Sequence, residues 1–192
     1  MRVRTCRVGG TRGREGFTLI ELMVVVAILA ILMGMMIPGA GMIMKKAKSS
    51  TARTNAMIVQ TALQRYRTEY NVWPDFAKGR NKEHFSDDKF MEVMVPNPTG
   101  RPPAENLKRI KFIETSKNAT VEVSSGKFEY QDPWGKPFQY LVNETPQDTM
   151  ELGNFRHDYD GPKEIRAKVL VWSAGPDGDY TSWGDNVWSW DY

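Results

Sequence analysis

Cysteine and histidine are scarce in this chain of 192 residues, which contains one cysteine, Cys6, and two histidines, His84 and His157. A single cysteine excludes an intrachain disulfide and a cluster of thiolate metal ligands. Neither histidine belongs to a metal-ligand or nucleophile motif, and the sequence has no glycine-rich phosphate-binding loop. The sequence therefore gives no indication of an enzyme.

The chain also lacks an excess of basic residues outside the N-terminus. Residues 1–16 contain five arginines and one acidic residue, Glu15. The rest of the chain has one more acidic than basic residue, so it lacks the positive excess of a nucleic-acid-binding surface. We expect no nucleic-acid partner.

A long apolar stretch follows the arginines, and residues 17–37 contain one charged residue, Glu21. As a helix this stretch would be about 32 Å long, close to the ~30 Å hydrocarbon core of a membrane. The positive-inside rule then keeps residues 1–16 in the cytoplasm and sends residues 38–192 across the membrane. A secretory signal cleaved near "PGAG" (38–41) is the alternative, but such signals have a shorter apolar core.

The segment "GFTLIELMVVVAILAIL" (16–32) resembles the N-terminus of type IV pilins and of the pseudopilins of type II secretion systems. The resemblance implies that residues 1–16 are a leader, which a prepilin peptidase in the membrane removes by cutting after Gly16. It also implies that the same enzyme methylates the new terminal residue, Phe17, and that Glu21 is the family glutamate involved in assembly.

Glu21 has a physical reason to seek a partner. A charged residue within a membrane-spanning helix costs about 2.5–3.5 kcal/mol on insertion scales. Cleavage after Gly16 would create an ammonium group on Phe17, and this group of one subunit could pair with Glu21 of its neighbour. Such a pair would set the axial register between subunits, because a misplaced subunit leaves both charges unpaired. An incidental glutamate near the membrane edge is the alternative.

The helical pattern continues over residues 38–73. Pro38 removes one backbone hydrogen bond and, with glycines around it, predicts a kink or local unwinding over residues 34–41. Apolar residues then recur at intervals of three and four, which predicts an amphipathic helix ending at "NVWP" (71–74). The apolar positions are Ala56, Val59, Leu63, Tyr66 and Tyr70. We expect one helix from Phe17 to Tyr70, whose first half lies in the membrane and whose second half packs on a domain.

Residues 74–192 are expected to form a globular domain in the periplasm. Residues 84–95 predict a short helix capped by Ser86, and residues 106–114 predict a strand or an extended loop. Alternating apolar residues predict strands over 136–143 and 165–174. We therefore expect an antiparallel sheet of about three or four strands that packs on the helix. The fold class is then α+β and, by the resemblance, pilin-like.

The segment "DPWGKPFQY" (132–140) resembles the segment that precedes the sheet in the major pseudopilin of type II secretion systems. From its residues it is a turn, in which Pro133 fixes one backbone angle and Gly135 supplies a positive φ. We assign this turn a structural role.

The segment "SAGPDGDYTSWGDNVWSW" (173–190) places aspartates between glycines. Calcium takes six to eight oxygen ligands, which a tightly turning acidic loop can supply. The resemblance to major pseudopilins implies a calcium site here, with ligands from Ala174 (through its carbonyl), Asp177, Asp185 and Asn186. A solvated turn capped by its own aspartates is the alternative, and Asp158 with Asp160 is a weaker second candidate.

Tryptophan is concentrated near the C-terminus, at Trp172, Trp183, Trp188 and Trp190. Exposed tryptophans could stack on sugars or on a partner, whereas buried ones belong to the core. We expect these four to be core residues.

These features predict a structural subunit of a type II secretion pseudopilus, assembled through its N-terminal helix to drive protein export across the outer membrane. Its partners would be identical and related pilin-like subunits, the prepilin peptidase and an inner-membrane assembly platform. One alternative is a type IV pilin of a surface fibre. Another is a membrane-anchored calcium- or carbohydrate-binding module that does not polymerise. The length of residues 75–126 leaves open whether the subunit is major or minor.

Overall fold

The computed structural model describes residues 16–79, 82–116, 118–147, 149–151, 161–162 and 164–190, with the backbone alone for residues 35–40 and 151. The chain divides into two units, Met1–Met44 and Lys45–Tyr192. Residues 1–15 of the predicted leader lie outside the described residues, as do Asp158 and Asp160 of the second acidic candidate.

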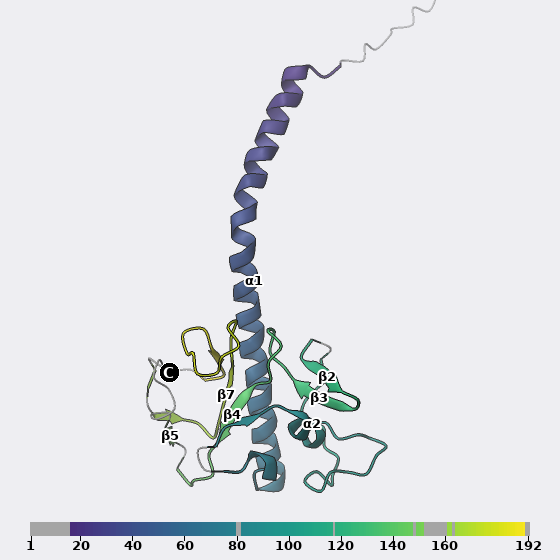
Figure 1. Ribbon diagram of the computed structural model, residues 1–192, viewed down its shortest axis with the longest axis vertical. Helices are drawn as coiled ribbons and strands as arrows, with labels where there is room; N and C mark the ends of the chain where they lie inside the picture. The colour runs from purple at the N-terminus through teal and green to yellow at the C-terminus, as the bar shows by residue number, and fades with distance from the viewer. Residues whose placement is uncertain are drawn as a thin grey trace, which may run out of the picture. The chain divides into compact units, whose positions relative to one another are not determined.

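Helix α1 (Leu19–Tyr70) is the longest element and contributes to both units (Figure 1). Its bounds agree closely with the predicted helix from Phe17 to Tyr70. A kink or local unwinding was predicted for residues 34–41. The helix is uninterrupted at Pro38, so the unwinding is not observed. One proline removes one hydrogen bond, and the bonds of neighbouring residues maintain the helix. A helix that combines the length and the apolarity needed to span a membrane is not found in the described part of the chain.

The second half of α1 buries the predicted apolar stripe. Ala56, Val59 and Leu63 are fully buried, and Tyr66 is 2% exposed. Tyr70 is half-buried and packs against the same core. Because these residues recur at helical spacing, they form one face that packs on the domain.

The main sheet consists of β1 (His84–Phe85), β4 (Gln139–Val142), β7 (Val169–Ser173) and β8 (Val187–Trp188), in the order β1-β4-β7-β8 with antiparallel neighbours. Figure 1 shows β4 and β7 beside the second half of α1. Alternate residues of these strands, among them Tyr140 and Val171, share a core with α1. This confirms the predicted antiparallel sheet packed on the helix.

The opposite face of the sheet is buried by a second core, which contains Trp172, Trp183 and Trp190, with Trp188 packed against it. The rings of Trp183 and Trp190 are tilted against one another, with centroids 6.1 Å apart. Both faces of β7 are therefore covered. The prediction of core residues is confirmed for Trp172, Trp183 and Trp190, whereas Trp188 is half-buried.

The strand predicted over residues 165–174 is wrong in one respect, because it is two strands. β6 (Glu164–Arg166) pairs with β5 (Thr149–Glu151), while β7 pairs with β4 and β8. The Ala167 N–H donates to the Ile165 carbonyl, 3.1 Å away, so the chain bends between β6 and β7. Ile165 consequently packs in the second core, whereas Val169 packs towards α1.

The segment between α1 and β4 contains the 3-10 turn η1 (Asp75–Ala77), helix α2 (Asp88–Met94) and the hairpin of β2 (Thr120–Ser124) and β3 (Lys127–Tyr130). The N-cap of α2 is Asp87, which accepts from the Phe90 N–H at 3.1 Å. The prediction of Ser86 as the cap was therefore wrong. Ser86 is buried, and its hydroxyl donates to the carbonyl of Tyr130 instead.

Residues 106–114 form an extended loop organised by the buried side chain of Asn106. Its Nδ2 donates to the carbonyls of Val93 at 2.7 Å and Ile110 at 2.8 Å. Its Oδ1 accepts from the Tyr70 hydroxyl at 2.8 Å and from the Ile110 N–H at 3.0 Å. One side chain thus joins the ends of α1 and α2 to this loop.

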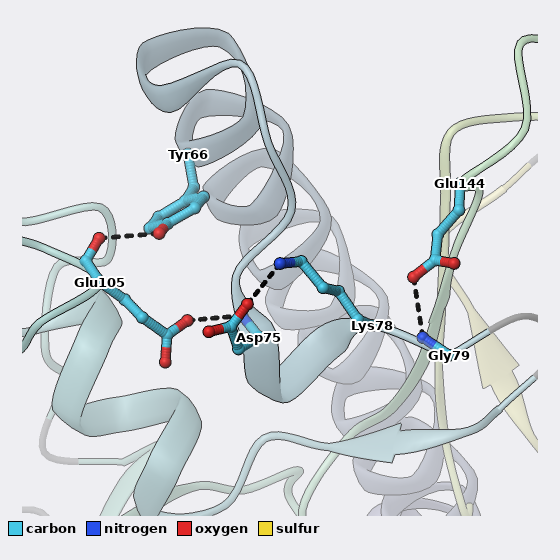
Figure 2. Close-up of polar contacts among 6 residues, drawn as sticks. All are labelled: Tyr66, Asp75, Lys78, Gly79, Glu105 and Glu144. Carbon is cyan, nitrogen blue, oxygen red and sulfur yellow. Dashed lines mark hydrogen bonds and ion pairs between the residues drawn. The ribbon is translucent and has the colours of Figure 1, made fainter.

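A polar network next to this loop ties the C-terminal end of α1 to the domain (Figure 2). The Tyr66 hydroxyl donates to the Glu105 carbonyl at 2.7 Å, and the Asp75 N–H donates to Glu105 Oε2 at 2.6 Å. Lys78 forms an ion pair with Asp75. Burial raises the pKa of Tyr66 to about 12. Burial also raises the pKa of Glu105, and the charge of Asp75 adds to this effect.

Candidate functional site

The N-terminal candidate site lies at the start of α1. Gly16 and Phe17 precede the helix, and the Phe17 side chain is 87% exposed. All described side chains of the Met1–Met44 unit are exposed, and they are mainly large and apolar. Leu19, Ile20, Leu22, Met23, Val24, Val25, Val26, Ile28, Leu29, Ile31, Leu32 and Met33 belong to this surface. Such a surface is unfavourable in water and suits lipid or other helices.

Glu21 forms a capping box with Thr18. The Thr18 N–H and hydroxyl donate to Glu21 Oε2 at 2.8 and 2.7 Å. In return, the Glu21 N–H donates to the Thr18 hydroxyl oxygen at 3.3 Å. These bonds satisfy backbone donors that the first turn of a helix otherwise leaves free.

The role of Thr18 was missed by the sequence reasoning, although a threonine three residues before a glutamate is the usual signal of this motif. The capping box means that Glu21 has a partner within its own chain. Its carboxylate is hydrogen-bonded before any second subunit approaches, which lowers the cost of placing it at the start of an apolar helix.

The C-terminal candidate site is the loop between β7 and β8. It brings together Asp177 and Asp185, two of the predicted ligands that are eight residues apart in the sequence. Burial raises the pKa of Asp185, and the negative charge of nearby Asp177 raises it further. A hydrogen bond from the Asp177 backbone and the positive charge of Lys45 on α1 act in the opposite direction. The two carboxylates thus lie close enough to influence each other.

Two oxygen atoms of this loop are buried without a hydrogen-bond donor among the described residues. They are Oδ1 of Asp185 and Oδ1 of Asn186. The amide nitrogen of Asn186 donates to the Tyr180 carbonyl at 3.1 Å, so its oxygen is oriented by this bond. A buried oxygen without a donor is costly, and a cation that prefers oxygen ligands would satisfy both atoms.

The donor chemistry of the loop therefore fits calcium. Asp177, Asp185 and Asn186 supply side-chain oxygens, and Ala174 is fully buried at the start of the loop. A cluster of three or more histidine, cysteine, aspartate or glutamate side chains able to hold a metal does not occur among the described residues. A complete ligand set would thus have to include amide and carbonyl oxygens, as the prediction assumed.

Asp179 serves the turn itself. Its Oδ1 accepts from the Thr181 N–H at 2.9 Å and from the Thr181 hydroxyl at 2.7 Å. These bonds lower the pKa of Asp179. The Asp179 N–H donates in turn to Asp177 Oδ1 at 2.9 Å. The alternative of aspartates that cap their own turn thus applies to Asp179, which was not among the predicted ligands, and also to Asp177, which was.

Gly175 allows the two ends of the loop to approach closely. Its φ is +69°, and a Cβ at this position would lie 2.6 Å from the Asp185 carbonyl oxygen. A side chain here would therefore clash with backbone, which is less able to move than a flexible side chain. Only glycine combines this φ with this contact at low cost.

Residues 11–37 match the family described as the prokaryotic N-terminal methylation motif. Type II secretion system core protein G of Pseudomonas aeruginosa is 32% identical over 144 residues, which cover 74% of this chain and 84% of that protein. The protein of the same name from Aeromonas hydrophila is 27% identical over 172 residues, which cover 90% and 94%. The crystal structure of the major pseudopilin from the type 2 secretion system of enterohaemorrhagic Escherichia coli aligns with 80% of this chain and 96% of its own, at 19% identity and a TM-score of 0.42.

Proposed function

The chain belongs to the family of type II secretion system core protein G, and from this membership we propose that it is the major structural subunit of a type II secretion pseudopilus. Subunits assemble through their N-terminal helices into a periplasmic filament, which moves folded proteins across the outer membrane. The observation that carries this proposal is a relationship to core protein G that extends over most of both chains. It favours a secretion pseudopilus over a surface type IV pilus, and a structural role over a catalytic one.

Maturation removes residues 1–16. The prepilin peptidase cuts between Gly16 and Phe17 and methylates the Phe17 amine. The methylation motif over residues 11–37 supports this proposal, as does the position of both residues ahead of the first turn of α1.

Residues 17–37 anchor the mature chain in the inner membrane, and residues 38–73 lead into the periplasmic domain of residues 74–192. The exposed apolar side chains before Gly34 support this arrangement, because lipid or sister helices would cover them. During assembly at the inner-membrane platform, the Phe17 ammonium of a neighbouring subunit approaches Glu21. The capping box holds Glu21 in one orientation for this approach.

Calcium binds in the C-terminal loop through Asp177, Asp185, Asn186 and the Ala174 carbonyl. The unpaired oxygens of Asp185 and Asn186 support this proposal. When bound, the ion neutralises the excess negative charge and joins the two ends of a loop that no disulfide closes.

The proposed assembly is tested by Glu21→Ala in the full chain, expressed together with a type II secretion system. We expect this variant to reach the membrane but to enter filaments poorly. Glu114→Ala removes an exposed carboxylate of the domain, 89% of whose side chain is accessible, and should assemble normally. Filament yield is measured by shearing, sedimentation and immunoblotting. Normal filament yield with Glu21→Ala would contradict assembly through Glu21 and favour a non-polymerising anchor.

A further inference from the structure

The turn over residues 132–136 is closed by the buried carboxylate of Asp132, which is 3% exposed. Its Oδ1 accepts from the N–H groups of Trp134 and Lys136, both at 2.9 Å. Its own N–H donates to the Lys136 carbonyl at 2.8 Å. These bonds leave the second carboxylate oxygen, Oδ2, free to bind outside the turn.

Asp132 Oδ2 accepts from the hydroxyl of Ser173, which lies 41 residues later at the end of β7. Ser173 is fully buried. Its oxygen also accepts from the Gly175 N–H at 3.0 Å. Ser173 therefore connects the turn to the first residues of the C-terminal loop.

The connection continues to the proposed ligands. Gly175 packs directly against the backbone of Asp185, with no room between them for a Cβ. At the middle of the loop, the Tyr180 hydroxyl donates to the Pro137 carbonyl, just beyond the turn. Two separate points of the loop are thus held on the segment that begins with Asp132.

We propose that Asp132, acting through Ser173 and Gly175, is a positioning residue for the calcium ligands Asp177 and Asp185. This inference rests on the proposed calcium site. A loop that is ordered before the ion arrives loses less conformational entropy on binding, so its affinity is higher. Groups that hydrogen-bond to metal ligands and fix their orientation raise the affinity for the metal in the same way. Removing such a group typically lowers metal affinity 10- to 100-fold.

If Asp132 and Ser173 only stabilised the fold, substituting them would have a different effect. The substitution would lower the stability of the calcium-free protein and leave the affinity for calcium unchanged. Ser86 provides a matched control, because it is also a fully buried serine with two similar hydrogen bonds. Its hydroxyl donates to the Tyr130 carbonyl at 2.5 Å, and its oxygen accepts from the Phe138 N–H at 2.7 Å.

The experiment is a calorimetric titration of the full chain in detergent with Ca²⁺, after removal of bound metal with a chelator. We expect Ser173→Ala to lower the affinity about 10-fold or more. We expect Asp132→Asn to act in the same direction, because its amide nitrogen cannot accept from the Ser173 hydroxyl. Ser86→Ala should lower the melting temperature of the calcium-free protein but keep the affinity within about twofold of the wild type, since loss of a buried hydrogen bond affects stability.

Asp185→Asn, which removes a proposed ligand charge, separates the two proposals. If it abolishes binding while Ser173→Ala and Asp132→Asn bind like the wild type, the positioning role is wrong and the calcium site stands. If the wild type binds no Ca²⁺, both the calcium site and the positioning role are wrong. Should Ser173→Ala fail to fold, Asp132→Asn decides, because it retains the oxygen that accepts from Trp134 and Lys136.

Discussion

Thr18 and Glu21 form reciprocal hydrogen bonds at the start of α1, with the Thr18 hydroxyl donating to the Glu21 carboxylate and accepting from its N–H. The glutamate proposed to bind a neighbouring subunit is thus held first by its own chain. The capping box and the proposed intersubunit pair are compatible, because the cap fixes the carboxylate at the helix end where the Phe17 amine of a neighbour would arrive.

Replacing Thr18 with valine should loosen the first turn of α1. The variant loses the hydroxyl that donates to Glu21 and accepts from its N–H, and loss of an N-terminal cap typically costs about 1 kcal/mol. Hydrogen exchange followed by mass spectrometry should show faster exchange of the amides near Glu21. Thr18→Ser keeps the hydroxyl and should exchange like the wild type. Equal exchange in the valine variant and the wild type would contradict the role of the cap.

The mature chain should begin at N-methylated Phe17. Cleavage after Gly16 would place the new amine directly ahead of the capping box, where the proposed assembly requires it. Intact-mass and N-terminal peptide analysis of protein from membranes of cells with a prepilin peptidase will measure this. A chain that begins near Gly41 would indicate a secretory signal peptide instead.

Asn106→Ala should destabilise the domain strongly. The substitution removes a buried amide that makes four hydrogen bonds and leaves buried backbone groups unpaired, so we expect a loss of about 2–4 kcal/mol in the free energy of unfolding. Urea denaturation followed by tryptophan fluorescence will measure it. Asn97→Ala is the control, because Asn97 is exposed and bonds only within its own turn. Similar losses for both variants would show that Asn106 has no special role.

The raised pKa of Glu105 makes the stability of the folded protein depend on pH. Burial, with the charge of Asp75, raises the pKa of Glu105 above its ordinary value of 4.5. The folded state therefore binds this proton more tightly than the unfolded state. The contribution of Glu105 to stability is fully present at pH values below its ordinary pKa, and it is lost as pH rises through the raised pKa.

Glu105→Gln tests this sign, because it removes the titrating group and keeps an oxygen that can accept from the Asp75 N–H. The stability of Glu105→Gln relative to the wild type should increase as pH rises from 4 towards 7. Urea denaturation of both proteins at a series of pH values will measure the difference. A relative stability that decreases over this range would contradict the raised pKa.

Gly175→Ala should destabilise the C-terminal loop. The alanine would have to adopt a φ of +69° with its Cβ 2.6 Å from the Asp185 carbonyl oxygen, so we expect a loss of about 1–3 kcal/mol. Gly184→Ala is the matched control in the same loop, because no atom lies within 4 Å of its Cβ position. Thermal unfolding of both variants will measure the effect. A Gly175→Ala protein as stable as Gly184→Ala would show that the close approach is not required.

Local patterns in the sequence predicted the parts of this fold that depend on periodicity. The helical stripe of Val59, Leu63 and Tyr66 and the alternation of Tyr140 and Val142 both place these residues in the core. The cleavage and assembly residues, which remain predictions, were likewise proposed from one continuous segment, and residues 11–37 match the N-terminal methylation motif. These features can be read from the sequence because a backbone repeat determines which side chains share a face.

Other features depended on the competition between neighbouring residues. Asp87 rather than Ser86 caps α2, because the Ser86 hydroxyl is taken by a distant carbonyl in the core. The bend at Ala167 interrupts an alternating pattern that continues without change in the sequence. A local sequence pattern does not show which of two neighbouring residues, such as Ser86 and Asp87, will form a hydrogen bond with a distant part of the chain instead.

The sequence by itself determined the long amphipathic helix and the strand faces, because each of these depends on residues close together in the chain. It also determined the membership of a secretion family, through similarity that extends over most of the chain. Only the tertiary structure decided that Asp132 contacts Ser173 and that Gly175 contacts Asp185. These pairs meet because β7 ends beside the turn that precedes β4, and this arrangement follows from packing of the whole domain around α1. The proposed calcium ligands are therefore held by contacts that no spacing in the sequence reveals.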